Sequence, residues 1–271
     1  MTGLGTRRDR PAARGLGPAG LGPLQKGTLV LSPHFDDAAL SIGGALAARA
    51  FPDPVCIYTI FGISNYTSGR FHAGWRRVTN LRRCEDRRYA ALVGATCAFA
   101  EFQEAGLRIG SDFQSLFRCR GNPYPSKPAG FDRALREIVL EYRPWLLVCP
   151  LGIGDHWDHL LVYRAVRKMR LSFRLPVLFY EDLPYAEHLG PRGVERAIAS
   201  LGRRFHSITI PIDLDTKCAG LTCYASQLGD VDVQRVRKYA SDLAKWKRAH
   251  GPRERLWTST PALLGRAGWW G

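Results

Sequence analysis

The chain alternates short apolar runs with longer stretches in which apolar residues recur at helical spacing. The apolar runs predict strands near residues 28–32, 54–60, 96–101, 145–150, 176–181 and 205–210. The helical spacing predicts helices over residues 38–50, 75–93, 131–142, 158–170, 192–202, 214–228 and 231–249. Because strands and helices alternate along most of the chain, the pattern predicts an α/β fold with one mainly parallel sheet covered by helices on both faces.

Three stretches fall outside this pattern. Residues 1–26 are rich in Gly, Pro and Arg and lack an apolar segment, which predicts a disordered leader rather than a signal peptide. Between residues 102 and 130, repeated Gly and Pro predict a long irregular loop of the kind that often serves as a lid or specificity element. We expect a single domain over residues 27–258 and a short C-terminal tail over residues 259–271.

Histidine and aspartate residues gather on two turns that each join a predicted strand to a predicted helix. These residues are His34, Asp36, Asp37, His156, Asp158 and His159. Parallel strands place their carboxyl ends at one edge of a sheet, so we expect the two turns to share a site. Imidazole and carboxylate groups suit a divalent, zinc-like ion, and two His with one carboxylate leave a position open for water. Such an ion makes amide hydrolysis feasible at neutral pH.

A hydrolytic site also needs groups that move protons. Asp36 is the candidate for the general base. His156 would stabilise the tetrahedral oxyanion or act as an acid, and Asp158 would fix the tautomer of that imidazole ring. A purely structural interpretation is the alternative, because Asp favours helix N-termini and an isolated His is usually structural. Two such turns in matching strand-to-helix contexts favour the metal site.

Residues 32–46 together with residues 156–159 resemble the PIG-L/LmbE family of zinc-dependent N-deacetylases. Further similar stretches are residues 82–95, residues 179–185, Lys217 and residues 224–227, which extends the likeness over most of the predicted domain. The resemblance implies a single domain with a Rossmann-like fold.

The resemblance also implies a role for each residue of the two turns. His34, Asp37 and His159 match the residues that bind Zn2+ in the family, although another divalent ion could take the same ligands. Asp36 matches the general base. His156 matches the residue that polarises or protonates in the tetrahedral step.

The two motifs depart from the family pattern at three positions. Many members carry Glu where this chain has Ala38, and the usual Pro of the two motifs is replaced by Phe35 and Trp157. No ligand and no base is lost by these changes. The two aromatic side chains would either stack on a sugar or pack against the sheet, and packing is favoured.

Three residues outside the turns are expected to contact substrate. Arg82 could reach a hydroxyl or phosphate group, but it could equally form a surface ion pair with Glu85, three residues further along a helix. Tyr185 and Gln227 are similar to family positions near the mouth of the pocket.

The resemblance implies removal of an N-acetyl or other N-acyl group from an amino sugar. The expected substrate is an N-acetylglucosaminyl-type glycoside, a nucleotide sugar or a glycosylated natural product. One alternative is an amidase that acts on a thiol conjugate, similar to mycothiol conjugates, or on another acylated amine. A second alternative is a carbohydrate- or nucleic-acid-binding protein without turnover.

Charge and cysteine usage modify this picture only slightly. The formal net charge of +15 favours an acidic partner such as a phosphate-bearing amino sugar, but much of the excess is Arg scattered along solvated helix faces. The chain contains no nucleic-acid-binding signature and no apolar run long enough to span a membrane, and the pattern predicts no particular oligomer.

The seven cysteines form no CxxC pair, so we expect free thiols and a cytoplasmic protein. Cys218 and Cys223 are disfavoured as zinc ligands, because no second pair completes a set of four.

Overall fold

The computed structural model describes residues 27–69, 74–110, 116–117, 127–173, 175–201 and 205–260. The strands are β1 (Thr28–Ser32), β2 (Val55–Thr59), β3 (Thr96–Phe99), β4 (Leu146–Pro150), β5 (Val177–Tyr180), β6 (His206–Pro211) and β7 (Arg253–Thr258). The helices are α1 (Asp37–Ala47), α2 (Trp75–Leu92), α3 (Ala105–Ile109), α4 (Phe131–Tyr142), α5 (Trp157–Phe173), α6 (Tyr185–Ala199), α7 (Leu214–Leu221) and α8 (Asp230–Trp246), with a 3₁₀ turn over Thr222–Tyr224.

One sheet, with strand order β3-β2-β1-β4-β5-β7-β6, forms the centre of the domain. Strands β1 to β5 run parallel to one another, and β7 pairs antiparallel with both β5 and β6. The central strands β1 and β4 are buried along their whole length, which explains why their sequences are apolar without alternation. The predicted single α/β domain with a mainly parallel sheet is therefore confirmed.

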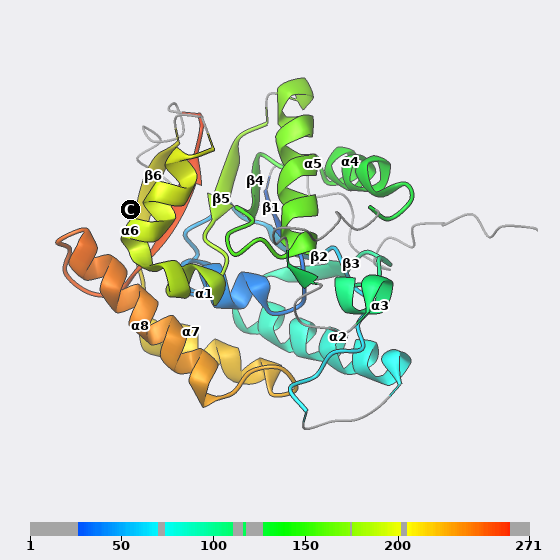
Figure 1. The fold of residues 1–271 in the computed structure, drawn as a ribbon, viewed down its shortest axis with the longest axis horizontal. Coiled ribbons are helices and arrows are strands. Elements are labelled where there is room, and N and C mark those ends of the chain that lie inside the picture. The colour runs from blue at the N-terminus through cyan, green and yellow to red at the C-terminus, as the bar shows by residue number, and fades with distance from the viewer. Residues whose placement is uncertain are drawn as a thin grey trace, which may run out of the picture.

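Helices cover both faces of this sheet. In Figure 1, α4 and α5 lie on one side, and α2, α7 and α8 lie on the other. Helix α7 packs against α1, α2 and α8, whereas α5 packs against β4 and α4. The chain therefore leaves β1 toward one face and the neighbouring strand β4 toward the opposite face. The carboxyl ends of β1 and β4 form the switch point at which open α/β sheets bind their ligands.

Several elements differ from the predicted ones. Strand β7 was not predicted because it begins with the charged residues Arg253, Glu254 and Arg255, which do not form an apolar run. Most of its side chains are nevertheless buried. The last two bind buried groups: Glu254 accepts a hydrogen bond from Lys217 at 2.6 Å, and Arg255 donates one to Glu181. Burial of paired charges does not appear as an apolar run.

Two helices also begin where none was expected. Helix α3 lies inside the stretch that was predicted to be an irregular loop. Helix α6 begins at Tyr185 rather than near residue 192, because a break at Gly190, followed by Pro191, obscures its first turns in the sequence. The remaining expectations for the loop, at residues 111–115 and 118–126, lie outside the described residues, as do the leader and residues 261–271 of the tail.

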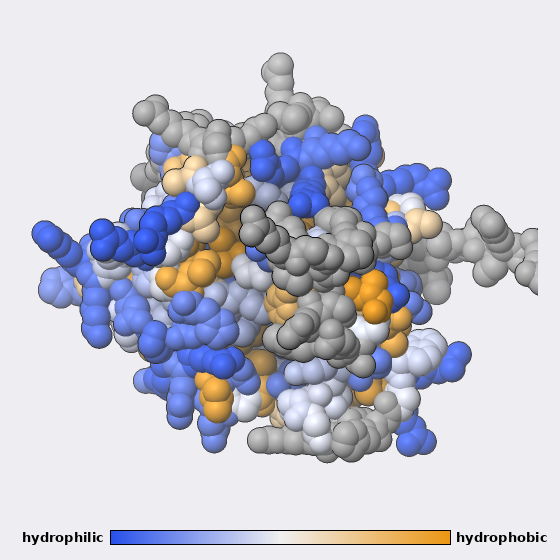
Figure 2. Space-filling view, viewed as in Figure 1, coloured by the Kyte–Doolittle hydropathy of each residue, from blue (hydrophilic) through white to orange (hydrophobic). Residues whose placement is uncertain are grey.

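The surface carries many paired charges. Figure 2 shows hydrophilic residues over most of the side on which α8 lies. On this helix, Nη2 of Arg237 lies 2.7 Å from Oδ1 of Asp215, and Nζ of Lys238 lies 3.1 Å from Oδ2 of Asp242. These pairs fit the expectation of basic residues on solvated helix faces. Within the described ranges, every helix is either too short or not apolar enough to cross a bilayer.

Candidate active site and metal centre

The turn after β1 is held by its own polar groups. The Ser32 hydroxyl donates a hydrogen bond to the carbonyl of His34 at 2.6 Å and accepts one from the Ala38 amide at 3.1 Å. The His34 amide donates to Oδ2 of Asp37 at 2.7 Å. These bonds fix the backbone at His34, just before α1, and the carboxylate of Asp37 in the first turn of that helix.

The turn after β4 uses left-handed backbone to reach α5. Gly152, Gly154 and Asp155 have φ angles of 76°, 87° and 62°. A Cβ atom on Gly154 would lie 2.4 Å from the Cβ of Tyr185, so glycine is needed there for space as well as for backbone conformation. Directly after this turn, His156 precedes α5 and His159 lies in its first turn.

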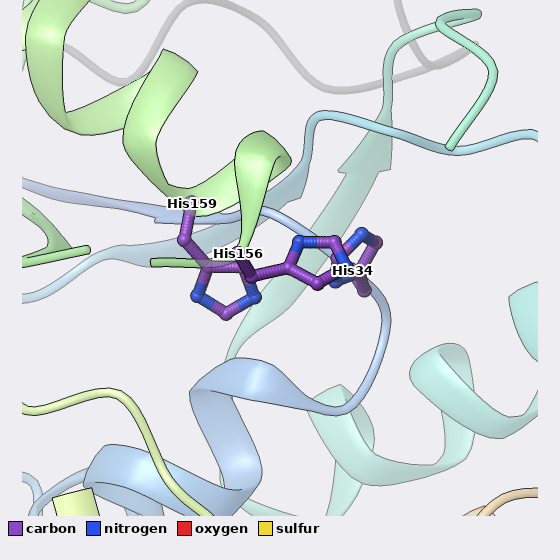
Figure 3. Close-up of side chains that lie close together, drawn as sticks. All are labelled: His34, His156 and His159. Carbon is purple, nitrogen blue, oxygen red and sulfur yellow. The ribbon is translucent and has the colours of Figure 1, made fainter. Parts of the chain in front are cut away.

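The three histidines of the two turns meet at the switch point (Figure 3). His34, His156 and His159 each offer a ring nitrogen, and these nitrogens lie within 4.8 Å of one another. The rings of His156 and His159 are almost fully buried, and that of His34 is partly exposed. The expectation that the two turns share one site is confirmed at the level of the three histidines.

Asp37 lies between two of these rings. Its Oδ2 atom is 3.2 Å from Nδ1 of His34 and 3.2 Å from Nε2 of His159. Two ligands that bind one zinc-like ion in tetrahedral geometry are about 3.3 Å apart. In addition, the buried Nε2 of His159 makes no hydrogen bond with any described residue. The geometry therefore fits a divalent ion, with His156 as a further nearby nitrogen.

A carboxylate contacts the second ring nitrogen of His34 and of His159, on the side that faces away from Asp37. Nε2 of His34 lies 3.0 Å from Oδ2 of Asp158, and Nδ1 of His159 lies 2.7 Å from Oδ1 of Asp182. The other oxygen of Asp182 accepts a hydrogen bond from the Ile153 amide at 2.8 Å. Carboxylates in this position orient metal-binding histidines and raise the basicity of the ligand nitrogen. Asp182 was not among the predicted site residues, although its place directly after β5 is the same strand-end signal that marked the two turns.

Asp158 differs from its predicted role. Its carboxylate was expected to fix the tautomer of His156, but that carboxylate contacts His34. The backbone amide of Asp158 donates instead to Nδ1 of His156, at 3.3 Å, which leaves the ring proton on Nε2. Burial and the nearby His34 and His159 hold the pKa of His156 well below its usual range, so this ring is neutral.

Opposing influences set the pKa values of the aspartates. Burial alone raises the pKa of Asp37, but the neighbouring His159 and His34 outweigh burial and hold this pKa well below its usual range. For Asp36, burial raises the pKa and Arg82 only partly offsets the effect. The pKa values of these two neighbouring carboxylates are thus shifted in opposite directions by their surroundings, which favours different roles for the two groups.

Arg82 is a buried residue rather than part of a surface ion pair. Its guanidinium lies 3.4 Å from Oδ1 of Asp36 and 3.2 Å from Oε2 of Glu104, and it donates to the Ser64 hydroxyl at 2.8 Å. The alternative pairing with Glu85 is wrong, because Glu85 accepts hydrogen bonds from Ser226. A contact between Arg82 and substrate stays a prediction.

The other predicted residues occupy distinct places around the site. The Tyr185 ring lies against His159, with centroids 5.5 Å apart, and Gln227 is buried and donates to the carbonyl of Tyr66 at 2.8 Å. Whether these two side chains touch substrate stays a prediction. Phe35 and Trp157 are both buried, which confirms that they pack in the protein interior.

Comparisons with known proteins give the family. The family model described as PIG-L: GlcNAc-PI de-N-acetylase matches residues 29–170, which is more than half of the chain. This chain belongs to the PIG-L family. Among curated proteins, it is 34% identical to the 2'-N-acetylparomamine deacetylase of Streptomyces fradiae over 261 residues, which cover 87% of this chain and 90% of that protein.

Several solved structures share the fold of this chain. The zinc-inhibited form of teicoplanin deacetylase Orf2 matches with a TM-score of 0.64 and 23% identity, covering 86% of this chain and 97% of that one. GalB, the 4-carboxy-2-hydroxymuconate hydratase of Pseudomonas putida KT2440, matches with a TM-score of 0.56 and 18% identity, covering 87% and 96%. One fold therefore serves more than one reaction. Family membership and the similarity to the Streptomyces deacetylase confirm the expected N-deacetylase class for this PIG-L chain.

Proposed function

We propose that this PIG-L chain is a zinc-dependent hydrolase that removes an N-acetyl group from an amino sugar within a larger glycosylated natural product. The observation that carries the proposal is the position of Asp37 Oδ2, 3.2 Å from one nitrogen of His34 and 3.2 Å from one nitrogen of His159. We assign these three residues as the metal ligands. When bound, the ion would polarise the acyl oxygen and lower the pKa of a water molecule.

The proton transfers fall to the chain's own residues. Asp36 takes a proton from the attacking water as the new C–O bond forms at the acyl carbon. It then returns the proton to the sugar nitrogen as the C–N bond breaks, so that acetate and the free amine leave. Its raised pKa suits the first step, because a carboxylate of higher pKa is a stronger base. Arg82, 3.4 Å away, orients the carboxylate.

His156 completes the proposed mechanism. Its neutral ring carries a proton on Nε2, because Nδ1 accepts from the backbone of Asp158. A buried N–H donor next to the reacting carbon stabilises the negative charge that develops on the acyl oxygen. Asp158 acts indirectly, since its carboxylate holds His34.

Charge and compartment refine the proposal. Arg82 and Arg108 reach the site, but both are paired with carboxylates of the chain, so neither supports a phosphate group on the reacting sugar. We therefore propose a substrate without phosphate, such as a compound related to 2'-N-acetylparomamine. The described cysteines are free thiols, which supports a cytoplasmic location.

The decisive experiment combines metal analysis with product identification. Purified protein is stripped with a chelator, reloaded with Zn2+ and incubated with 2'-N-acetylparomamine and with simple N-acetylglucosamine derivatives. We expect mass spectrometry to detect acetate and the free amine only in the reloaded sample. Release of an acid larger than acetate from a thiol conjugate, with no turnover of any N-acetyl sugar, would favour the amidase alternative instead.

A further inference from the structure

Arg108 reaches the candidate metal centre from a segment that belongs to neither turn. It lies in α3, and its Nη2 atom is 2.6 Å from Oδ1 of Asp158. The Arg108 side chain is 11% exposed and that of Asp158 is 0% exposed, so this ion pair is shielded from solvent. Its guanidinium carbon also lies 4.9 Å from the ring centre of Phe61, and Nη1 donates to the carbonyl of Gln103. Protein contacts on several sides therefore fix the guanidinium.

The Asp158 carboxylate connects Arg108 to a proposed metal ligand. Its Oδ2 atom is 3.0 Å from Nε2 of His34 and accepts a hydrogen bond from the Ala105 amide at 2.8 Å. Its Oδ1 atom is the one that Arg108 holds. Helix α3 therefore binds both oxygens of Asp158, through the Ala105 amide and the Arg108 guanidinium. This carboxylate in turn orients the His34 ring through Nε2, the nitrogen that faces away from Asp37.

We propose that Arg108 is a positioning residue for the metal centre, acting on His34 through Asp158; this inference rests on the metal-dependent function proposed above. With both oxygens of Asp158 bound, the carboxylate is held in one rotamer, and Nδ1 of His34 faces Asp37, 3.2 Å from its Oδ2 atom. Without Arg108, Oδ1 becomes a buried carboxylate oxygen that has lost its charged partner, which favours rotation of the carboxylate or entry of water. The His34 ring then loses its fixed orientation, and metal affinity falls while substrate contacts stay intact.

The test measures Zn2+ affinity directly, by competition with a chromophoric chelator against metal-free full-length protein. Changing an outer partner of a metal-binding histidine costs about 10–100-fold in affinity, so we expect the dissociation constant of Arg108→Gln to rise within that range. We expect Arg108→Lys to recover part of the loss, because an ammonium group can still pair with Oδ1. At saturating Zn2+, the KM of Arg108→Gln for the N-acetyl sugar should equal that of the parent.

Arg83→Gln is the matched control. Arg83 lies 2.8 Å from Glu101 and its guanidinium lies 5.3 Å from the ring centre of Phe99, so it is also an arginine with an ion pair and a ring contact near this segment, but it does not touch Asp158. We expect parental Zn2+ affinity in this variant. Equal affinity in the parent and Arg108→Gln would overturn the inference while leaving the proposed function standing. A parent that binds no Zn2+ would overturn both.

Discussion

The carboxylate of Asp182 lies 2.7 Å from Nδ1 of His159, although 23 positions separate the two residues in the sequence. The histidine lies in the first turn of α5, and the aspartate follows β5, the strand to which α5 leads. The crossover thus returns the chain to the same edge of the sheet, where the second residue supports the first. The opposite nitrogen of His159 faces Asp37 at 3.2 Å, so one ring links two carboxylates.

Asp182→Asn is expected to lower metal affinity without removing a ligand. The amide oxygen can still accept from His159, but the negative charge that raises the basicity of the ring is lost. After dialysis against a weak chelator, elemental analysis should find about tenfold weaker zinc retention than in the parent. Asp213→Asn changes an exposed N-cap carboxylate of α7 and should retain zinc normally. Equal zinc content in Asp182→Asn and the parent would rule out this role for Asp182.

Asp36→Asn is expected to remove the general base and to leave the metal content unchanged. A positioned acid–base group contributes roughly 10²–10⁴-fold to the rate, so kcat for deacetylation should fall within this range. Zinc content should stay parental because the Asp36 side chain contacts Arg82, outside the proposed ligand set. Asp53→Asn, an exposed carboxylate near Arg49, serves as the control. A variant at Asp36 that keeps parental kcat would show that another group takes the proton.

Gly154→Ala is expected to damage the site as well as the backbone. Its φ angle of 87° is strained for any residue with a side chain, and the new Cβ would lie 2.4 Å from the Cβ of Tyr185. Gly251→Ala is the matched control, because its φ angle is 73° and nothing lies within 4 Å of an added Cβ. Both variants should lose about 1–3 kcal/mol of stability in urea denaturation from backbone strain. Only Gly154→Ala should also lose activity, and equal activity in both variants would dismiss the Tyr185 contact as unimportant.

Asp86 is expected to make stability depend on pH. Burial raises its pKa from 3.8 to about 7, although hydrogen bonds from Thr59 and Tyr224 partly offset the effect. Because the folded state holds this proton more tightly than the unfolded state, the contribution of Asp86 to stability is present at low pH. It decreases as the pH rises through the interval from 3.8 to about 7, and it changes no further above that interval.

The corresponding variant is Asp86→Asn, which cannot ionise. Relative to the parent, its free energy of unfolding should therefore improve between pH 5 and pH 8, as measured by urea denaturation at about these two pH values. Glu137→Gln, at an exposed position of α4, should show no such change relative to the parent. A constant difference between parent and Asp86→Asn across this range would mean that Asp86 stays ionised throughout.

The hydrophobic pattern sufficed for the elements that bury apolar side chains. The fully buried runs of β1 and β4 and the helical spacing of α2 and α4 are local signals, and all four elements were predicted to within two residues. Strand β7 escaped prediction because its interior positions hold charges whose partners come from distant segments, such as Lys217 for Glu254. Local patterning cannot reveal a charge that is buried only because its partner is brought beside it.

For the site, the sequence by itself determined which residues could carry the chemistry. His34, Asp36 and Asp37 after one strand and His156, Asp158 and His159 after another specify a shared edge, because parallel strands end on the same side of a sheet. Only the tertiary structure decided the partnerships: Asp158 turns its carboxylate to His34, Asp182 supports His159, and Arg108 approaches from α3. These contacts join residues that are far apart in the sequence, and strand order and side-chain rotamers set their distances. The spacing of residues along the chain therefore cannot predict which of them become partners.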